Sequence, residues 1–183
     1  FFKTLGLDYY FIKDGHNFEE LLEVFSKVKD TKKAVVVHMC TVKAKGSEFW
    51  EKNKEIAHYI MPWMLNKDFK MPDFWENYST ITREYILNKI KTDKTVIAMT
   101  PATPSLTWFD ENFRKEAWNN YIDVWIAEEQ AVTMASGIAK NWWKPILVVW
   151  SPFIQRTYDQ LSHDLALNSN PATILIAFNW ISP

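Results

Sequence analysis

Short apolar runs alternate with segments of helical periodicity toward the C-terminal end of the chain, and this alternation constrains the fold more than any other feature. Strands are expected at 121–125, 146–150 and 173–178, and helices at 128–140 and 153–167. Strands separated by helices of this length pair in parallel, with right-handed crossovers. The sequence therefore predicts an α/β fold in which a parallel sheet is flanked by helices.

The N-terminal part of the chain carries one helix signal and one strand signal. Asn17 is placed to cap a helix over 17–29, because Glu20 stands three residues further on, as in a capping box. The β-branched run within 34–40 predicts a buried strand. The charged segment 43–55 lacks an apolar face and is interpreted as a surface loop.

The middle of the chain is interpreted as a linker that leads into a second folded region. Segment 61–77 contains two prolines and no helical period. A helix is expected over 79–91 and a short strand over 96–100, which the prolines of 101–104 bring to an end.

Charge and cysteine content exclude several classes of protein. The formal net charge is −1 and the pI is about 6.5, so nothing favours binding to nucleic acid or to an anionic membrane. Cys40 is the single cysteine, which rules out an internal disulfide and favours the cytoplasm. The sequence has no signal-peptide pattern and no apolar stretch of membrane-spanning length. We expect the chain to be a piece of a longer polypeptide, because both ends are abrupt.

The balance of glycine and tryptophan is unusual. The chain has 4 glycines and 10 tryptophans in 183 residues, whereas an average usage of about 7% would give about a dozen glycines. An α/β protein needs glycine in tight turns and wherever backbone approaches a phosphate. Either the sequence has been redesigned or some residue identities are assigned imperfectly, and the sequence leaves both alternatives open.

Two adjacent carboxylates, Glu128 and Glu129, follow an apolar run at the point where a strand ends and a helix begins. A carboxyl group among apolar neighbours at such a point can have a raised pKa and share a proton with a ligand nitrogen. The simpler alternative is that both acids stabilise the helix N-terminus through its dipole.

The next strand and helix repeat this plan, with Phe153 and Arg156 in the first turns of the helix. An aromatic side chain at this place can stack on a planar ligand, beside a cation. The simpler alternative is a core phenylalanine and a surface arginine that pairs with Asp159 or Asp164.

Both stretches match patterns of one enzyme family. Residues 123–132 match Asp-Val-x-Ile-Ala-Glu-x-x-Ala-Val. Residues 150–160 match aromatic-Ser-Thr-Phe-x-Gln-Arg-x-Tyr-Asp-Gln, with Pro152 in place of threonine. With these residues the chain resembles the 1-deoxy-D-xylulose-5-phosphate synthase family of transketolase-type thiamine-diphosphate enzymes. The resemblance covers 1–58 and 78–178.

The resemblance implies part of a thiamine-diphosphate-binding fold of the pyrimidine-domain type. It implies that 1–60 is the C-terminal end of a diphosphate-binding domain, 61–78 a linker, and 79–183 the first part of a pyrimidine-binding domain. The implied cofactors are thiamine diphosphate and Mg²⁺. The metal ligands are expected outside this segment, so no metal-binding residue is assigned. A homodimer is also implied.

The resemblance gives three residues a role toward the cofactor. Glu128 would hydrogen-bond the aminopyrimidine and favour the imino tautomer, whose nitrogen removes the C2 proton of the thiazolium. Phe153 would stack on the aminopyrimidine, and Arg156 would lie beside it.

Three further residues take their roles from the same resemblance. His58 corresponds to a histidine that contacts the substrate, and it is the second candidate catalytic residue after Glu128. An exposed loop histidine is the alternative. Ser47 stands where the family has a tyrosine that touches the cofactor, and Trp150 stands where it has a tyrosine near the substrate.

The implied reaction is a transferase reaction: pyruvate is decarboxylated and its two-carbon unit passes to glyceraldehyde 3-phosphate. The product feeds the biosynthesis of isoprenoid precursors, thiamine and pyridoxal. The alternative is a non-catalytic α/β fragment or paralogue that serves as a structural or association module. Two kinds of departure favour that alternative: glycines are lost, as where Trp142–Trp143 replace a Gly-Gly turn, and Trp180 replaces a phosphate-binding arginine.

Overall fold

The computed structural model describes residues 1–58, 60, 62–65 and 78–177. The chain divides into two compact units, Phe1–Phe69 and Lys70–Pro183, and each is described here by itself. Most of the expected linker, and Trp180 with its neighbour Asn179, lie outside the described residues. Within the described ranges no helix is both long and apolar enough to cross a membrane.

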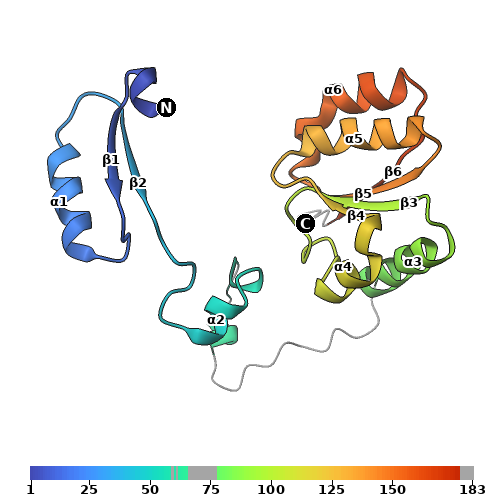
Figure 1. Cartoon of the computed structure of the whole chain (residues 1–183), viewed down its shortest axis with the longest axis horizontal. Coiled ribbons are helices and arrows are strands. Elements are labelled where there is room, and N and C mark those ends of the chain that lie inside the picture. The colour runs from blue at the N-terminus through green and yellow to red at the C-terminus, as the bar shows by residue number, and fades with distance from the viewer. Residues whose placement is uncertain (59, 61, 66–77, 178–183) are drawn as a thin grey trace, which may run out of the picture. The chain divides into compact units, whose positions relative to one another are not determined.

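The first unit contains a parallel pair of strands connected by a helix (Figure 1). Strand β1 (Asp8–Ile12) pairs with β2 (Val35–Met39) in a register that sets Asp8 opposite Val35. Helix α1 (Phe18–Val28) lies between them in the chain, and a 3₁₀ turn, η1 (Phe2–Leu5), precedes β1. The expected strand at β2 is confirmed, but its predicted burial is wrong, because four of its residues are half-buried and one is exposed. Strand β1 was not predicted.

The expected cap of α1 is confirmed. The Asn17 side chain accepts hydrogen bonds from the backbone N–H groups of Glu19 at 3.0 Å and Glu20 at 3.2 Å. Asn17 Nδ2 donates to Glu20 Oε1 at 3.1 Å. The first two bonds satisfy backbone donors that the first turn of a helix otherwise leaves without partners, and the third joins the two side chains.

The prediction that 43–55 is a loop is wrong, because it contains the short helix α2 (Glu48–Lys52). Lys52 Nζ forms an ion pair with Glu48 Oε1 at 2.6 Å, and Trp50 is buried. A helix of five residues is too short to display an apolar period, so the sequence pattern could not reveal it. Two 3₁₀ turns follow, η2 (Ile56–His58) and η3 (Pro62–Leu65).

The second unit is built on a four-stranded parallel sheet with the strand order β4-β3-β5-β6. Its strands are β3 (Val96–Thr100), β4 (Tyr121–Asp123), β5 (Lys144–Trp150) and β6 (Thr173–Ala177). All three pairings are parallel, which confirms the expected fold class. Strand β3 lies between β4 and β5, and all of its residues are buried.

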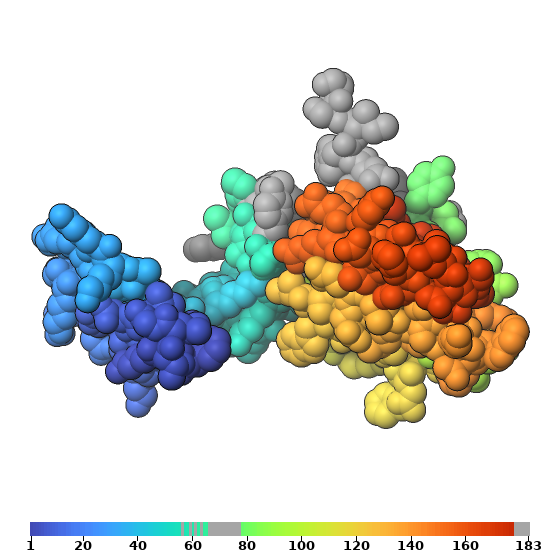
Figure 2. Space-filling view, turned by 90° about the horizontal axis from the view of Figure 1, so that it is seen from above, coloured from blue at the N-terminus to red at the C-terminus, as the bar shows by residue number. Residues whose placement is uncertain are grey.

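Helices cover both faces of this sheet (Figure 1). Helices α3 (Tyr78–Thr92) and α4 (Glu111–Ala117) lie on one face. Helix α5 (Glu128–Lys140) and the helical segment 154–166 lie side by side on the other (Figure 2). The even-numbered residues of β3 enter the core under α3 and α4, and the odd-numbered residues enter the core under α5, because side chains alternate along a strand. The first core is formed by Ile86, Ile90, Val96, Ala98, Phe109, Phe113, Ala117, Val148 and Ala177. The second is formed by Ile97, Met99, Ala131, Val132, Ala135, Leu147 and Leu165.

The expected helix over 153–167 is helical but irregular. It begins with a 3₁₀ turn, η5 (Ile154–Thr157), passes through α6 (Tyr158–Gln160) and ends in a π-helical stretch, η6 (Leu161–Ala166). Two hydroxyls of α5 hold the π-helical stretch at Asp164: Ser136 Oγ donates to the Asp164 carbonyl at 2.7 Å, and Thr133 Oγ1 donates to Asp164 Oδ2 at 2.6 Å. A carbonyl that is bonded from outside its own helix tolerates the wider π turn.

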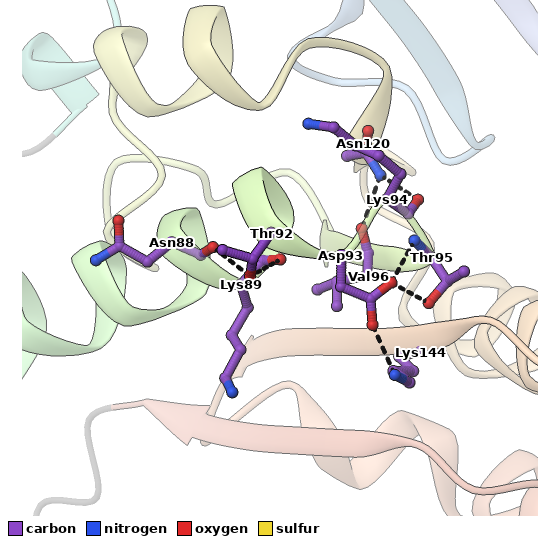
Figure 3. Close-up of polar contacts among 9 residues, drawn as sticks. All are labelled: Asn88, Lys89, Thr92, Asp93, Lys94, Thr95, Val96, Asn120 and Lys144. Atoms are coloured by element: carbon purple, nitrogen blue, oxygen red, sulfur yellow. Dashed lines mark hydrogen bonds and ion pairs between the residues drawn. The ribbon is translucent and has the colours of Figure 1, made fainter.

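Polar contacts fix the amino end of the sheet (Figure 3). Asp93 Oδ1 accepts hydrogen bonds from Thr95 N at 2.9 Å and Thr95 Oγ1 at 2.6 Å. Asp93 Oδ2 accepts from Lys144 Nζ at 2.6 Å, which ties the turn before β3 to the first residue of β5. Asn120 Nδ2 donates to the carbonyls of Lys94 and Val96. The hydrogen bonds from Lys144 and Thr95 hold the pKa of Asp93 well below its usual range.

This cluster leads to a prediction about stability. Replacing Asp93 with Asn should lower the melting temperature of the chain at pH 7, because the ion pair to Lys144 is lost. A lowered pKa in the folded state stabilises the protein above the unfolded pKa of about 4, and this stabilisation declines as the pH falls further. The deficit of Asp93→Asn should therefore shrink between pH 4 and pH 2, as measured by thermal unfolding followed by circular dichroism.

Asp159→Asn is the matched control, because Asp159 is an exposed carboxylate on α6 of the same unit. It should change the melting temperature little at any of these pH values. A deficit for Asp93→Asn that grows in acid, or that equals the deficit of the control at pH 7, would contradict the prediction.

Candidate functional site

The topology of the second unit has its switch point at the carboxyl ends of β3 and β5. From β3 the chain passes to β4 on one side, and it then crosses back to β5 on the other side. The segment after β3 leads to α4 on one face, whereas the segment after β5 leads to η5 on the opposite face. In open α/β sheets, ligands bind where neighbouring strands send their connections in opposite directions. This end of the sheet is therefore the place to look for function.

Glu128 is the first residue of α5 and is 2% exposed. Glu129, its neighbour, is exposed. The two side chains differ in direction by about 100° around the helix. The dipole of α5 favours a carboxylate in its first turn, yet only Glu128 is removed from water.

Arg156 compensates the buried charge of Glu128. Arg156 Nη1 lies 3.0 Å from Glu128 Oε2, and the Arg156 side chain is 49% exposed. The alternative pairing of Arg156 with Asp159 or Asp164 is therefore wrong, since the carboxylate that Arg156 contacts comes from another helix. A buried carboxylate is costly without such a partner, so the ion pair accounts for the burial of Glu128.

Phe153 and Trp150 lie at the same end of the sheet. Trp150 is the last residue of β5, and both aromatic side chains are half-buried. The Phe153 N–H donates to the Trp150 carbonyl at 2.9 Å, and the Arg156 N–H donates to the Phe153 carbonyl at 3.2 Å. Through these two turns the chain runs from Trp150 at the strand end, past Phe153, to Arg156, which pairs with Glu128.

Asp123 belongs to this site but was not among the predicted site residues. It ends β4, and its Oδ1 accepts hydrogen bonds from the N–H groups of Ala102 and Trp125, both at 2.9 Å. One carboxylate oxygen thus joins the loop after β3 to the turn that presents Glu128. The signal was present in the sequence, because Asp123 is the first residue of the matched pattern.

Ser47 and His58 belong to the first unit. Ser47 is half-buried and precedes α2 as its N-cap residue, without a capping side-chain hydrogen bond. His58 is exposed at the end of η2, and its Nδ1 lies 3.3 Å from Lys43 Nζ. His16 anchors the start of this segment, because its Nε2 accepts a hydrogen bond from the Val42 N–H at 2.7 Å. The structure therefore brings together Glu128, Trp150, Phe153 and Arg156, and it describes Ser47 and His58 separately.

The donor set at the second unit suits a planar heterocycle better than a metal ion. A buried carboxylate beside an aromatic ring can hydrogen-bond a ring nitrogen while the ring stacks. Among the residues that the structure describes, no group of three or more His, Cys, Asp or Glu side chains is placed to hold a metal. A carboxylate and an aromatic side chain are the groups that would hold an aminopyrimidine by a hydrogen bond and by stacking.

Comparison with known proteins agrees with this arrangement. Residues 77–179 match the family described as the transketolase pyrimidine binding domain, and residues 1–41 match the family described as 1-deoxy-D-xylulose-5-phosphate synthase.

Curated relatives carry the same enzyme name. A 1-deoxy-D-xylulose-5-phosphate synthase of Clostridium perfringens is 40% identical over 176 residues, which are 96% of this chain and 28% of the relative. Synthases of the same name from Clostridium kluyveri and Bacillus cereus are 36% and 39% identical, over 96% and 90% of this chain and 28% and 26% of their own lengths. The chain thus spans little more than a quarter of the curated relatives that it matches. The expected resemblance is confirmed, and because the first match covers more than half of the chain, the chain belongs to the transketolase pyrimidine-binding-domain family.

Proposed function

We propose that this chain is part of an enzyme that acts as its relatives are named, a 1-deoxy-D-xylulose-5-phosphate synthase. Its substrates are pyruvate and glyceraldehyde 3-phosphate. The second unit contributes the half of the active site that receives the pyrimidine ring of thiamine diphosphate. The observation that carries the proposal is the buried Glu128 carboxylate, paired with Arg156 at the ligand-binding edge of a domain whose family is described as pyrimidine binding.

Thiamine diphosphate, when bound, supplies a carbon nucleophile and an electron sink that amino-acid side chains lack. Glu128 holds or accepts a proton at a nitrogen of the pyrimidine ring, because its carboxylate is rigid at the start of α5 and removed from water. Phe153 packs on the face of the ring. Trp150 stands at the end of β5 on the side of the substrate.

Arg156 has two tasks in this proposal. It offsets the cost of burying Glu128 before the ligand arrives, and it keeps one oxygen of the carboxylate fixed by a hydrogen bond at 3.0 Å. A fixed carboxylate loses less freedom when a ligand binds, which favours productive geometry. Asp123 acts indirectly, because it holds the turn that precedes α5 and so positions Glu128.

The rest of the site is proposed to come from elsewhere. Mg²⁺ and the diphosphate group need oxygen ligands and donors, and these are assigned to parts of the enzyme outside this chain. Residues 1–60 form the end of the diphosphate-binding domain, 61–78 the linker and 79–183 the start of the pyrimidine-binding domain. Ser47 contacts the cofactor and His58 contacts the substrate. The enzyme is a cytoplasmic homodimer.

The alternative of a non-catalytic association module has less support. A module that serves only for folding or subunit contact has no use for a carboxylate buried beside a half-exposed arginine, since an apolar pair of similar volume is often as stable or more so. The ion pair between Glu128 and Arg156 therefore favours the enzyme.

The first prediction from this proposal separates the two adjacent acids. In an enzyme that contains this chain, Glu128→Gln should reduce the rate of C2-proton exchange of bound cofactor by about 10²–10⁴-fold, the usual value of a general acid–base residue. Glu129→Gln is the matched control and should change the rate little, because Glu129 is exposed at the helix start. Deuterium exchange followed by NMR is the measurement. Equal losses in both variants would show that the assignment of Glu128 is wrong.

The second prediction concerns the ion pair and needs no cofactor. Arg156→Ala should destabilise the chain more when Glu128 is present than when it is Gln, because a lone buried carboxylate is left behind. The coupling free energy from urea unfolding of the four chains of a double-mutant cycle should be about 1 kcal/mol or more. The same cycle with Glu129→Gln should be additive. Additivity in both cycles would refute an energetic role for the pair.

The third prediction concerns affinity. The isolated chain should bind thiamine diphosphate weakly, because the charge-assisted contacts to the diphosphate and Mg²⁺ are proposed to lie outside it. Calorimetric titration with the cofactor and MgCl₂ should give no saturation at low micromolar concentrations. Tight binding by the chain alone would mean that it holds the diphosphate end as well.

A further inference from the structure

Tryptophan occupies backbone conformations that normally belong to glycine. In the part of the chain that the structure describes, seven residues other than glycine have a positive φ, and four of them are tryptophans. A positive φ is a genuine outlier for a bulky residue, because the Cβ atom crowds the backbone, whereas glycine adopts it freely. The four angles are 70° at Trp108, 47° at Trp118, 62° at Trp125 and 66° at Trp142.

Trp142 ends helix α5 in the geometry that glycine most often provides. The Trp142 N–H donates to the Ala139 carbonyl at 2.9 Å, and the Trp143 N–H donates to the Ile138 carbonyl at 3.3 Å. This pair of bonds is the Schellman motif, in which the residue after the C-cap is left-handed and is usually glycine. Trp142 stands at that residue.

Trp118 stands in an even more restricted conformation. It is the C-cap residue of α4, with φ 47° and ψ −117°. These angles are close to those of the first central residue of a type II′ turn, a position that glycine dominates. The packing of α4 does not require a large side chain at this position, since Trp118 is 74% exposed.

Three of the four tryptophan side chains make little contact that could offset this strain, whereas Trp108 packs against the first core. Trp125 is 79% exposed and Trp142 is 90% exposed. The yellow part of the chain, around η4 (Trp118–Asn120) and β4, has a group that projects from the surface in Figure 2. Trp108 is half-buried, and its Nε1 is buried without a hydrogen-bond partner in the described part of the chain. An orphaned donor of this kind destabilises a protein.

Three of the four glycines of the chain stand where the backbone requires them, whereas Gly137 lies inside α5 in a position that a larger residue could take. Gly6 and Gly46 have φ values of 78° and 96°. At Gly15 a Cβ atom would come within 2.8 Å of the Cys40 carbonyl oxygen. The fold therefore uses glycine in the ordinary way, and tryptophan takes its place at four further positions.

We infer that residues 108, 118, 125 and 142 are glycine in the protein that the organism makes. The codon UGA links the two residues, because some genetic codes read it as tryptophan and others as glycine. One codon read as tryptophan accounts for part of the imbalance between the 10 tryptophans and the 4 glycines, because the four reassignments leave fewer tryptophans and double the glycines. Of the two alternatives that the sequence left open, misassigned residue identities account for the backbone angles. This inference does not rest on the proposed function.

The first test uses the chain with tryptophan and four single variants, each of which replaces one of the four tryptophans with glycine. The melting temperature should rise by about 1–4 °C in the variants of Trp118, Trp125 and Trp142, whose side chains are exposed, since relief of the left-handed strain exceeds the entropic cost of glycine. The rise should be smaller for Trp108→Gly, which also loses contact with the first core. Trp50→Gly is the control, because Trp50 is buried in α2 and has no positive φ. It should lower the melting temperature. A fall in all four variants like that of the control would overturn the inference.

The second test examines the protein and its gene in the organism itself. Tryptic peptides that span the four positions should have masses that correspond to glycine, and the gene should carry UGA at each of them. Peptides with tryptophan, or UGG codons at these positions, would overturn the inference whatever the melting temperatures show.

Discussion

A parallel sheet has to be covered on both faces, because its crossover connections place helices there and its strands are buried on both sides. Strand β3 shows this requirement most strongly, since every one of its residues is buried. Its even-numbered side chains pack under α3 and α4 and its odd-numbered side chains under α5. The requirement forces the chain to change faces between β4 and β5, and this change sets the edge of the sheet at which the candidate site lies. Fold and site thus follow from the same constraint.

The candidate site residues of the second unit stand at the ends of regular elements, where polar contacts hold them. Glu128 is fixed by α5 and by Arg156, and Asp123 holds the turn between β4 and α5 to the loop after β3. The consequence is a carboxylate whose position is set before any ligand arrives. Such preorganisation is what a proton-transferring group needs, because a residue that must first be ordered loses part of its advantage.

The sequence predicted the second unit well and the first unit less well, for physical reasons. The strand at Val96–Thr100 and the helix at Glu128–Lys140 are both confirmed to the residue, because each carries a strong local signal. Helix α4 was missed because its seven residues complete fewer than two turns. The pairing of Arg156 with Glu128 could not be predicted from spacing, since the two residues are 28 positions apart, whereas Asp159 is close in sequence. The proposed role of Glu128 comes from the matched sequence pattern, whereas the burial of its side chain is known only from the structure.

The Asp93 cluster lies at the amino end of the strands, whereas Glu128 lies beyond their carboxyl ends. Strands β3 and β5 have five and seven residues, which at about 3.3 Å per residue separates the two ends by roughly 15–20 Å. This distance exceeds the screening length of about 8 Å at physiological ionic strength. Solvent-exposed charges at one end are therefore largely screened from charges at the other end. Substitutions in the Asp93 cluster can therefore change the acid or heat stability of the fold while the electrostatic environment of Glu128 stays unchanged. Stability and ligand binding can thus evolve independently.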